Sequence, residues 1–455
     1  MQDTPLEDLS EHVKKQREFF ASKGTLTLEV RLNALSRFQN VFEAHQDAIL
    51  YALKDDLGKP TIEAFLSEYY FLLEELRLIR KSLKKWLRPK KAKSPFYFLP
   101  CRNRIHREPH GNALVIAPWN YPIQLALSPL AAAVAAGNTV ILKPSEEAPA
   151  TAKILHELIA ESFPPEHAIV LQGGPTFTDR LLDHRFDFLF FTGSTNVGKV
   201  IAQKAAQHLT PHVLELGGKC PCVVDATANL SIAAKRILVG KLFNAGQTCF
   251  APDFVAVHES AKAKLIEELT EIMERLPWEN EIARIINRRH YERLLSLVAG
   301  EPVQKGTDDP DALHLAPRIL PEAQWSDAVM QQEVFGPILP VVTYRTQDDI
   351  IEKLSRYSTP LALYCFSKDP RFTAHLLSNV PSGGVCLNDV GKHASNLHLP
   401  FGGKGDSGHG RYRGKAGVEA FSYQRTVSTR FFLPDPFESL PPRAKQTTML
   451  RKWMK

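Results

Sequence analysis

The feature that most constrains the fold is an alternation of short apolar runs with longer helical stretches, which begins at Gly111. Strands that alternate with helices indicate βαβ units and therefore parallel sheets. The alternation breaks at Gly217-Gly218 and then resumes, so we predict two α/β domains. The predicted strands are residues 113–117, 139–142, 168–171, 188–191, 222–224 and 254–258, and the predicted helices are residues 125–136, 150–163, 197–209, 232–243 and 261–275.

The regions on either side of this alternation predict helices and strands of other kinds. Leucines recur at helical spacing within residues 7–58, and Gly58-Lys59-Pro60 is a stop signal ahead of a second helix over 61–86. Residues 94–110 set aromatic and β-branched residues between Pro, Asn and Gly, which is typical of a projecting hairpin. Residues 421–432 alternate as a strand does, and we expect them to pair with that hairpin or with another subunit.

Composition and charge are those of an ordinary globular protein. The chain has 455 residues, of which 44% are hydrophobic and 23% charged, and it is long enough to bury a large core. The net charge of +6 is mild. Its basic clusters, at residues 81–93 and after Pro441, lack the base-stacking aromatic residues or reading helix of a nucleic-acid site. We therefore expect no nucleic-acid partner.

No segment predicts membrane insertion. The apolar run over 125–142 is interrupted by Ser128, Pro129, Gly137 and Asn138, so it predicts a buried helix followed by a strand. The first residues are acidic and lack a basic start followed by an apolar run, which is the pattern of a presequence. We therefore expect a cytoplasmic protein.

Six cysteines are scattered along the chain, and we expect them to be reduced thiols. Cys220 and Cys222 lack the second Cys or His pair of a zinc site, so we predict no metal. Cys249 ends the segment Asn244-Ala-Gly-Gln-Thr-Cys249, after a glycine-containing turn. A thiol there is either a buried filler or a nucleophile, and the local sequence leaves both readings open.

The segment from Phe190 to Val200 predicts an anion-binding turn. A strand runs into the small residues Gly193 and Ser194 and then into a helix, which directs backbone N–H groups and a positive dipole end at the turn. The spacing of Gly193, Gly198 and Lys199 nearly matches a P-loop, but Val200 offers no hydroxyl to bind magnesium. A dinucleotide pyrophosphate needs no such ligand. The literal G-x-G-x-x-G at 403–408 neither ends a strand nor opens a helix, and it predicts a tightly turned or mobile loop.

Seven phrases in order give the chain a resemblance to the aldehyde dehydrogenase superfamily, and this resemblance runs over nearly the whole chain. The segments His208-Leu-Thr-Pro211 and Asn388-Asp-Val390 are most similar to its class 3 branch, which accepts medium-chain aliphatic and aromatic aldehydes. The seven phrases are Pro118-Trp-Asn-Tyr-Pro122, Lys143-Pro-Ser-Glu146, Phe191-Thr-Gly-Ser-Thr195, Leu214-Glu-Leu-Gly-Gly-Lys219, Gly246-Gln-Thr-Cys249, Glu333-Val-Phe-Gly-Pro337 and Pro400-Phe-Gly-Gly403.

The resemblance implies an α/β fold with a doubly wound nucleotide-binding domain, a related α/β catalytic domain and a small β arm that joins subunits. A homodimer is therefore expected. The implied boundaries are 1–92 with 111–214 for the NAD(P)-binding domain, 215–420 for the catalytic domain, 93–110 with 421–434 for the oligomerisation arm, and 435–455 for a C-terminal tail.

Aldehyde oxidation has chemical requirements that three residues of these phrases can meet. Hydride leaves a tetrahedral thiohemiacetal far more readily than it leaves a bare carbonyl, so a thiolate is required, and Cys249 is the candidate. The oxyanion needs preorganised donors, which the side-chain amide of Asn120 and the backbone N–H of Cys249 can supply. The remaining thioester must be hydrolysed, and Glu215, flanked by leucines, is placed to have the raised pKa of a general base.

Further roles are carried over from the family by resemblance. Glu333 would hold the nicotinamide ribose, and Phe335 would pack by the nicotinamide ring. Either Glu215 or Glu333 could activate the hydrolytic water, and the sequence leaves that choice open. The remaining assignments are Lys143 and Glu146 at the adenosine ribose, Trp119, Gly193 and Ser194 by the phosphates, and Tyr121 and Phe243 along the aldehyde tunnel, where ordinary packing is an equal alternative.

The predicted activity is NAD- or NADP-dependent oxidation of aldehydes to carboxylic acids. Glu146 favours NAD, because its carboxylate would repel a 2′-phosphate, but class 3 enzymes often accept both cofactors. One alternative is a CoA-acylating enzyme of the same fold, against which Glu215 argues. Another is a binding protein that has lost catalysis, against which the intact set of Cys249, Glu215 and Asn120 argues.

Overall fold

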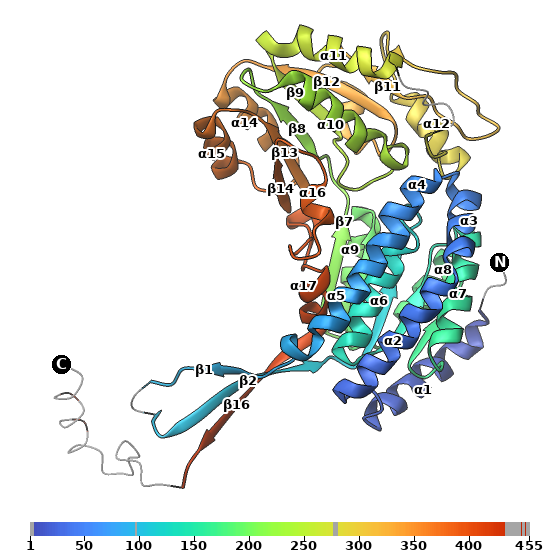
Figure 1. Ribbon diagram of the computed structural model, residues 1–455, viewed down its shortest axis with the longest axis vertical. Coiled ribbons are helices and arrows are strands. Elements are labelled where there is room, and N and C mark those ends of the chain that lie inside the picture. Colours follow the sequence, from blue (N-terminus) through green and yellow to red (C-terminus); the bar gives the residue numbers. More distant parts are fainter. Residues whose placement is uncertain (1–3, 96–97, 276–280, 433–446, 448–450, 452–455) are drawn as a thin grey trace.

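The computed structural model describes residues 4–95, 98–275 and 281–432, together with Thr447 and Arg451. Its chain forms two α/β units and a β arm that projects from them (Figure 1). The expected C-terminal tail lies outside the described residues apart from Thr447 and Arg451, as do residues 96–97 and 433–434 of the expected arm. The α/β fold class predicted from the alternation is confirmed.

The first unit contains a six-stranded sheet with the order β15-β7-β6-β3-β4-β5, parallel except for β15. The chain enters the sheet at β3, places β4 on one side of it and later places β6 on the other. Ligands of doubly wound sheets bind at such a switch point, outside the carboxyl ends of the strands. The strands are β3 (Asn112–Ile116), β4 (Thr139–Lys143), β5 (Ala168–Val170), β6 (Phe188–Gly193), β7 (His212–Leu216) and β15 (Gly408–His409).

Helices cover both faces of this sheet because its strands are apolar on both sides. Along β3, Leu114 and Ile116 join one buried cluster with α1, α8 and α9, whereas Ala113 and Val115 join the other with α2, α5, α6 and α7. Every residue of α6 is buried, as expected for the interrupted apolar run. The helices are α1 (Leu9–Ala21), α2 (Leu28–Ala44), α3 (Gln46–Leu57), α5 (Phe71–Trp86), α6 (Gln124–Ala136), α7 (Pro149–Ser162), α8 (Pro175–Leu182) and α9 (Thr195–Gln207).

The second unit contains a seven-stranded sheet with the order β10-β11-β12-β9-β8-β13-β14, in which only the β10–β11 pair is antiparallel. The strands are β8 (Pro221–Val224), β9 (Phe254–His258), β10 (Val303–Gln304), β11 (Arg318–Leu320), β12 (Ile338–Tyr344), β13 (Ala362–Phe366) and β14 (Gly384–Leu387). The helices are α10 (Leu230–Leu242), α11 (Lys262–Arg275), α12 (Arg288–Ser296), α13 (Ala328–Gln331), α14 (Gln347–Ser355), α15 (Pro370–Asn379) and α16 (Lys392–Ser395).

The arm is a three-stranded antiparallel sheet made of β1 (Lys90–Ala92), β2 (Cys101–Pro109) and β16 (Ser422–Arg430). It extends away from both α/β units (Figure 1). The expectation that the C-terminal strand pairs with the hairpin is confirmed, because β16 pairs with β2 along its whole length. The hairpin begins earlier than expected, since β1 precedes residue 94.

Two segments differ in detail from the predicted elements. The helix expected over 61–86 is α4 (Thr61–Ala64) and α5 joined by a π-helical insertion over Phe65–Tyr70, and π insertions are frequent at functional sites. Residues 405–407 form a short 3-10 turn, as expected of a tight loop, and lead into β15. The helix that follows, α17 (Gly414–Ala420), packs on α6, so the chain returns to the first unit after residue 400.

The predicted domain boundaries stay a prediction, and β7 continues across the one placed between residues 214 and 215. In the part of the chain that the structure describes, no helix has both the length and the apolar character needed to cross a membrane.

Candidate active site

Cys249 follows a strained turn at the end of α10. Asn244 and Ala245 both have φ of +53°, and Gly246 has φ of +72°, so three successive residues adopt the left-handed conformation. This conformation raises the free energy of a non-glycine residue, and it persists only where surrounding contacts impose it. Gly246 has a second requirement, because a Cβ there would overlap the carbonyl oxygen of Gly336.

Buried hydrogen bonds hold this turn in place. The backbone N–H of Asn244 donates to the Glu63 carboxylate at 2.9 Å. The Gln247 side chain donates to the carbonyl oxygens of Asn244, at 3.2 Å, and Arg284, at 3.0 Å, and it accepts from the N–H of Ile286 at 3.1 Å. The backbone that leads to Cys249 is therefore fixed from several directions.

Asn120 lies beside this turn, on the loop between β3 and α6. Its side-chain Nδ2 donates to the carbonyl oxygen of Gln247 at 2.9 Å. Its own carbonyl oxygen accepts from the Asn244 side chain at 2.9 Å and from Lys59 Nζ at 3.1 Å. The structure therefore brings the predicted oxyanion donor and the predicted nucleophile together.

A fully buried ion pair contacts the loop that carries Asn120. Lys59 Nζ lies 2.5 Å from Glu68 Oε1 and 4.2 Å from the centre of the Tyr121 ring. Glu68 also accepts from the backbone N–H groups of Ile123, at 2.9 Å, and Gln124, at 3.0 Å. Because buried charges are stable only when paired and hydrogen-bonded, the pair and the loop fix each other's position.

Glu215 lies on β7, and both of its carboxylate oxygens are buried and have no hydrogen-bond partner among the described residues. Burial raises its pKa well above the usual range, and the charges of Arg413 and Arg411 oppose that rise. Gly402 allows the backbone to approach this carboxylate, since a Cβ at Gly402 would lie 2.9 Å from Glu215 Oε1. A raised pKa favours the protonated form of a carboxyl group, which can then exchange its proton during a reaction.

Glu333 and Phe335 lie on the loop that precedes β12. Burial and the nearby Asp253 carboxylate raise the pKa of Glu333 to about 8. A Cβ at Gly217 would overlap the Glu333 carboxylate, so these two segments touch. Phe335 has φ of +49°, and its ring makes an edge-to-face contact with Trp119 at 5.5 Å between centres.

The thiol of Cys249 is protonated in the free protein. Burial, followed by the Glu333 and Glu215 carboxylates, raises the pKa of Cys249 to about 12, while Arg413 acts in the opposite direction. The thiolate is the reactive form of cysteine, so the site needs a base that accepts the thiol proton. The carboxyl groups of Glu333 and Glu215, whose pKa values are themselves raised, are near enough to the thiol to influence its pKa.

Cys249 and Glu215 line one cavity of about 310 Å³. Tyr121 and Phe243, the two predicted tunnel residues, line it as well, and the Tyr121 hydroxyl lies 2.6 Å from Thr248 Oγ1. The walls are mainly apolar and aromatic. The other lining residues are Leu66, Ser67, Phe71, Gln124, Leu125, Thr192, Thr248, Val239, Gly240, Phe250, Val390, Gly391, Lys392, Ala394, Ser395, Phe401, Tyr412 and Arg413.

The residues predicted to bind a dinucleotide gather at the switch point of the first sheet. Lys143 ends β4 and lies 2.7 Å from the carboxylate of Glu146, while Gly193 ends β6 and Ser194 is the N-cap of α9. Trp119 follows β3. Solvent-facing N–H groups at a helix N-terminus suit a pyrophosphate, and a half-exposed carboxylate suits ribose hydroxyls, so this set of groups fits NAD or NADP.

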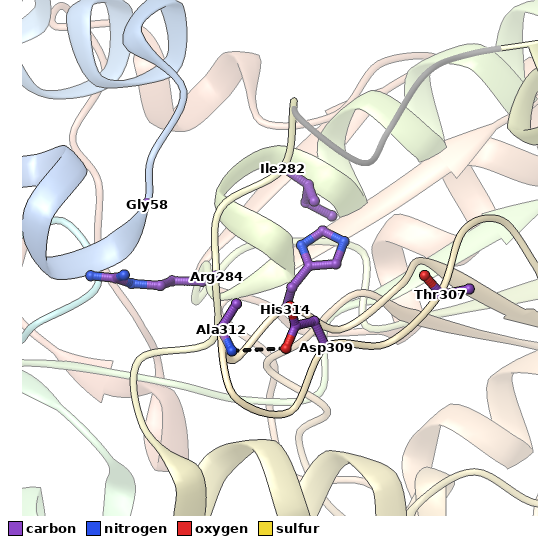
Figure 2. Close-up of a pocket in the computed structure, with 7 residues that line it drawn as sticks. All are labelled: Gly58, Ile282, Arg284, Thr307, Asp309, Ala312 and His314. Carbon is purple, nitrogen blue, oxygen red and sulfur yellow. Dashed lines mark hydrogen bonds between the residues drawn. The ribbon is translucent and has the colours of Figure 1, made fainter.

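A second pocket, of about 430 Å³, lies between the end of α3 and the loop over residues 305–316. Figure 2 shows Arg284 pointing away from His314 there, and Arg284 donates to the carbonyl oxygens of Asp55 and Asp56 at the end of α3. None of the predicted site residues lines this pocket. The predicted chemistry is therefore associated with the Cys249 cavity. The lining residues are Gly58, Ile282, Arg284, Thr307, Asp309, Ala312 and His314.

Comparison with known proteins identifies the family. The family model described as the aldehyde dehydrogenase family matches residues 1–427. The chain therefore belongs to the aldehyde dehydrogenase family and is an oxidoreductase. Within the family it is similar to class 3 members, as the sequence predicted: it is 39% identical over 431 residues to rat aldehyde dehydrogenase family 3 member B1, which covers 93% of this chain and 92% of the relative.

Two staphylococcal proteins are comparably similar. The 4,4′-diaponeurosporen-aldehyde dehydrogenase of Staphylococcus aureus is 39% identical over 434 residues, covering 94% of this chain and 95% of the relative. A solved structure of Staphylococcus aureus AldH in a substrate-bound state matches with a TM-score of 0.93 at 38% identity, covering 98% of this chain and 99% of that chain.

Three residues of the site were not singled out by their sequence context. Lys59 stood within a helix-stop signal, Glu68 within a predicted helix, and Arg413 in a glycine-rich stretch. A charged residue in such a context usually lies on the surface, and only the tertiary contacts reveal the burial of these three.

Proposed function

We propose that this protein oxidises medium-chain aliphatic or aromatic aldehydes to carboxylic acids, with NAD or NADP as the hydride acceptor and with thiohemiacetal and thioester intermediates on Cys249. The observation that carries the proposal is the shared cavity of Cys249 and Glu215, next to the amide of Asn120. A bound nicotinamide cofactor would supply the hydride acceptor, and the protein supplies the remaining groups.

In the first half of the reaction Cys249 attacks the aldehyde. Its thiol proton passes to a neighbouring carboxylate, and Sγ forms a bond to the carbonyl carbon. The Asn120 amide and the Cys249 N–H donate to the oxyanion that develops on the carbonyl oxygen. Loss of hydride from the carbon then leaves a thioester on Sγ.

In the second half Glu215 takes a proton from water, which attacks the thioester carbon. The C–S bond breaks, the acid leaves, and the thiol is restored. We assign this step to Glu215 rather than Glu333, because Glu215 lines the cavity with Cys249 and both of its oxygens are without a hydrogen-bond partner in the described part of the chain. The presence of Glu215 in the cavity also favours water over CoA as the acceptor of the acyl group.

The cofactor assignment follows from the groups at the switch point. Gly193, Ser194 and Trp119 would lie by the phosphates, Lys143 and Glu146 by the adenosine ribose, and Glu333 and Phe335 by the nicotinamide riboside. The contact between Phe335 and Trp119 supports this arrangement, because it joins the loop before β12 to the carboxyl end of β3. A homodimer joined by the projecting arm completes the proposal, since the arm leaves the edge of β16 unpaired within the described residues.

Replacement of Cys249 by alanine tests the function. Aldehyde-dependent formation of NADH or NADPH should fall below detection. Quenching of protein fluorescence by the cofactor should remain, because Cys249 is not one of the residues proposed to bind the dinucleotide. Sustained aldehyde oxidation by this variant would refute the mechanism. Acyl-CoA formation with negligible hydrolysis in the wild-type protein would instead favour the CoA-dependent alternative.

A further inference from the structure

Arg413 places a buried positive charge at the wall of the Cys249 cavity. The residue precedes α17, has φ of +86° and is only 3% exposed. Its charge reaches both reacting groups, because it opposes the rise of the pKa of Cys249 and of Glu215. The guanidinium therefore belongs to the space in which the substrate is bound.

The guanidinium is enclosed by aromatic rings. Its central carbon lies 4.5 Å from the ring centre of Phe71, 4.6 Å from that of Tyr412 and 5.5 Å from that of Phe401. With its amide turned so that both groups are satisfied, Gln124 accepts from Arg413 Nη2 at 2.7 Å. These contacts hold the side chain, but all of these partners are neutral.

Arg413 has no carboxylate partner among the described residues, a property that it shares with the buried Arg31 and Lys241. Lys59, Lys219 and Arg318 each contact a carboxylate, and the Lys219 pair with Asp253 measures 2.5 Å. Arg413 Nε is buried and has no hydrogen-bond partner in the part of the chain that the structure describes. A desolvated cation with a free donor is strongly stabilised by an anion that reaches it.

The cavity as a whole attracts negative charge. Lys392 adds a second cation at its exposed lining, and burial raises the pKa of Glu215, which favours the neutral form of that carboxyl group. Apolar walls concentrate the field of such charges, because little water is present to screen them. A neutral alkyl chain would gain no electrostatic stabilisation from these charges.

We propose that Arg413 is the binding site for a carboxylate at the far end of the substrate, and that the preferred substrates are therefore ω-carboxy aldehydes. A guanidinium matches the planar geometry of a carboxylate and can form two parallel hydrogen bonds with it. This inference rests on the proposed function, because it names the substrate class of the same cavity.

The test compares kcat/KM for a ladder of unbranched alkanals with kcat/KM for ω-carboxy aldehydes of the same chain lengths. For the wild-type protein, the carboxylated member should be preferred by about tenfold or more at one chain length, which is the effect of a charge-assisted hydrogen bond. The ratio of the two values is the readout, because a change at Arg413 also alters the charge near Cys249 and Glu215 for every substrate.

Two variants and a matched control isolate the guanidinium. R413Q should bring the ratio of kcat/KM for the ω-carboxy aldehyde to kcat/KM for the alkanal to about one. R413K keeps the positive charge but lacks the planar guanidinium, so it should retain part of the preference. R411Q removes a neighbouring cation that also acts on Glu215 but does not line the cavity, and it should keep the ratio. A wild-type preference for neutral alkanals at every length, or an unchanged ratio in R413Q, would overturn the proposal.

Binding of the products separates this inference from the proposed function. In the C249A protein, calorimetry should give a dicarboxylate of the selected length at least about tenfold tighter binding than the monocarboxylate, and R413Q should abolish the difference. This result would support the carboxylate site even if no aldehyde were turned over, which would refute the proposed function alone. Equal binding of the two acids to the C249A protein would refute the carboxylate site.

Discussion

The side-chain amide of Asn120 donates to the backbone carbonyl of Gln247, two residues before Cys249, at 2.9 Å. This bond uses one of the two protons of the amide and fixes the direction of the other. It also joins the loop after β3 to the turn after α10, so the proposed oxyanion donor and the proposed nucleophile move as one unit.

Replacement of Asn120 by alanine should lower kcat by about a hundredfold to a thousandfold, because one oxyanion donor is lost. The affinity for the cofactor should remain near that of the wild-type protein. Steady-state kinetics with a fixed aldehyde, together with a fluorescence titration of the cofactor, measures both quantities. A loss of less than about threefold in kcat would exclude Asn120 as an oxyanion donor.

Replacement of Lys59 by methionine should destabilise the protein by about 3–5 kcal/mol, because it leaves the Glu68 carboxylate buried without its partner. The double variant K59M/E68Q removes both charges and keeps an acceptor for the N–H groups of Ile123 and Gln124, so much of the stability should return. The kcat of this double variant should stay low, because the Asn120 carbonyl has lost one donor. Denaturant unfolding and kinetics of the two variants measure these effects, and full recovery of kcat would limit Lys59 to a role in stability.

The kcat should rise with pH above about pH 4, the ordinary pKa of a glutamate, because hydrolysis of the thioester needs Glu215 in its ionised form. The reaction needs carboxylates that can accept protons, and burial raises the pKa of Glu333 to about 8 and that of Glu215 above its usual range. A higher pH therefore increases the fraction of these carboxyl groups that is ionised and able to accept a proton. The apparent pKa values belong to the interacting set rather than to one residue.

The variant E333Q distinguishes the two carboxylates in the same experiment. If Glu215 is the base for hydrolysis, as proposed, the rising limb should persist in E333Q, whereas E215Q should show no turnover beyond the first equivalent at any pH. A flat profile in the wild-type protein, loss of the limb in E333Q, or sustained turnover by E215Q would contradict the assignment.

The turn before Cys249 offers a matched pair of substitutions. A245G should be tolerated with little change in stability, because glycine adopts positive φ without a steric cost but the variant loses a buried methyl group. G246A should be strongly destabilising and nearly inactive, since its Cβ would overlap Gly336 and displace the turn. Thermal unfolding and turnover of the two variants check this, and a stable, active G246A protein would show that the turn does not position Cys249.

Much of the fold followed from local patterns. Apart from β7, which was not among the predicted strands, the strands of both sheets between residues 112 and 258 were predicted, because they are buried on both faces and read as apolar runs. No local pattern predicted the π insertion at Phe65–Tyr70, whose Glu68 accepts hydrogen bonds from the backbone N–H groups of Ile123 and Gln124 in a later segment.

The site was predictable only in part. Cys249, Glu215 and Asn120 stand in recognisable phrases, and the structure brings them together, although their roles stay predictions. Lys59 and Arg413 are single charged residues whose surroundings come from segments far away in the chain, such as Asn120 for the former and Phe71 for the latter. Their burial is a property of the tertiary structure, and no spacing of residues encodes it.

The central claim is that an acyl group is transferred to Cys249, and the mass of the intact protein tests it most directly. When E215Q is mixed with an aldehyde and NAD or NADP, hydrolysis should be blocked, so the protein should gain the mass of one acyl group as about one equivalent of reduced cofactor forms. The double variant C249A/E215Q should gain nothing and reduce no cofactor. Reduced cofactor formed by E215Q without any gain of mass at Cys249, or an adduct that persists in C249A/E215Q, would contradict the account.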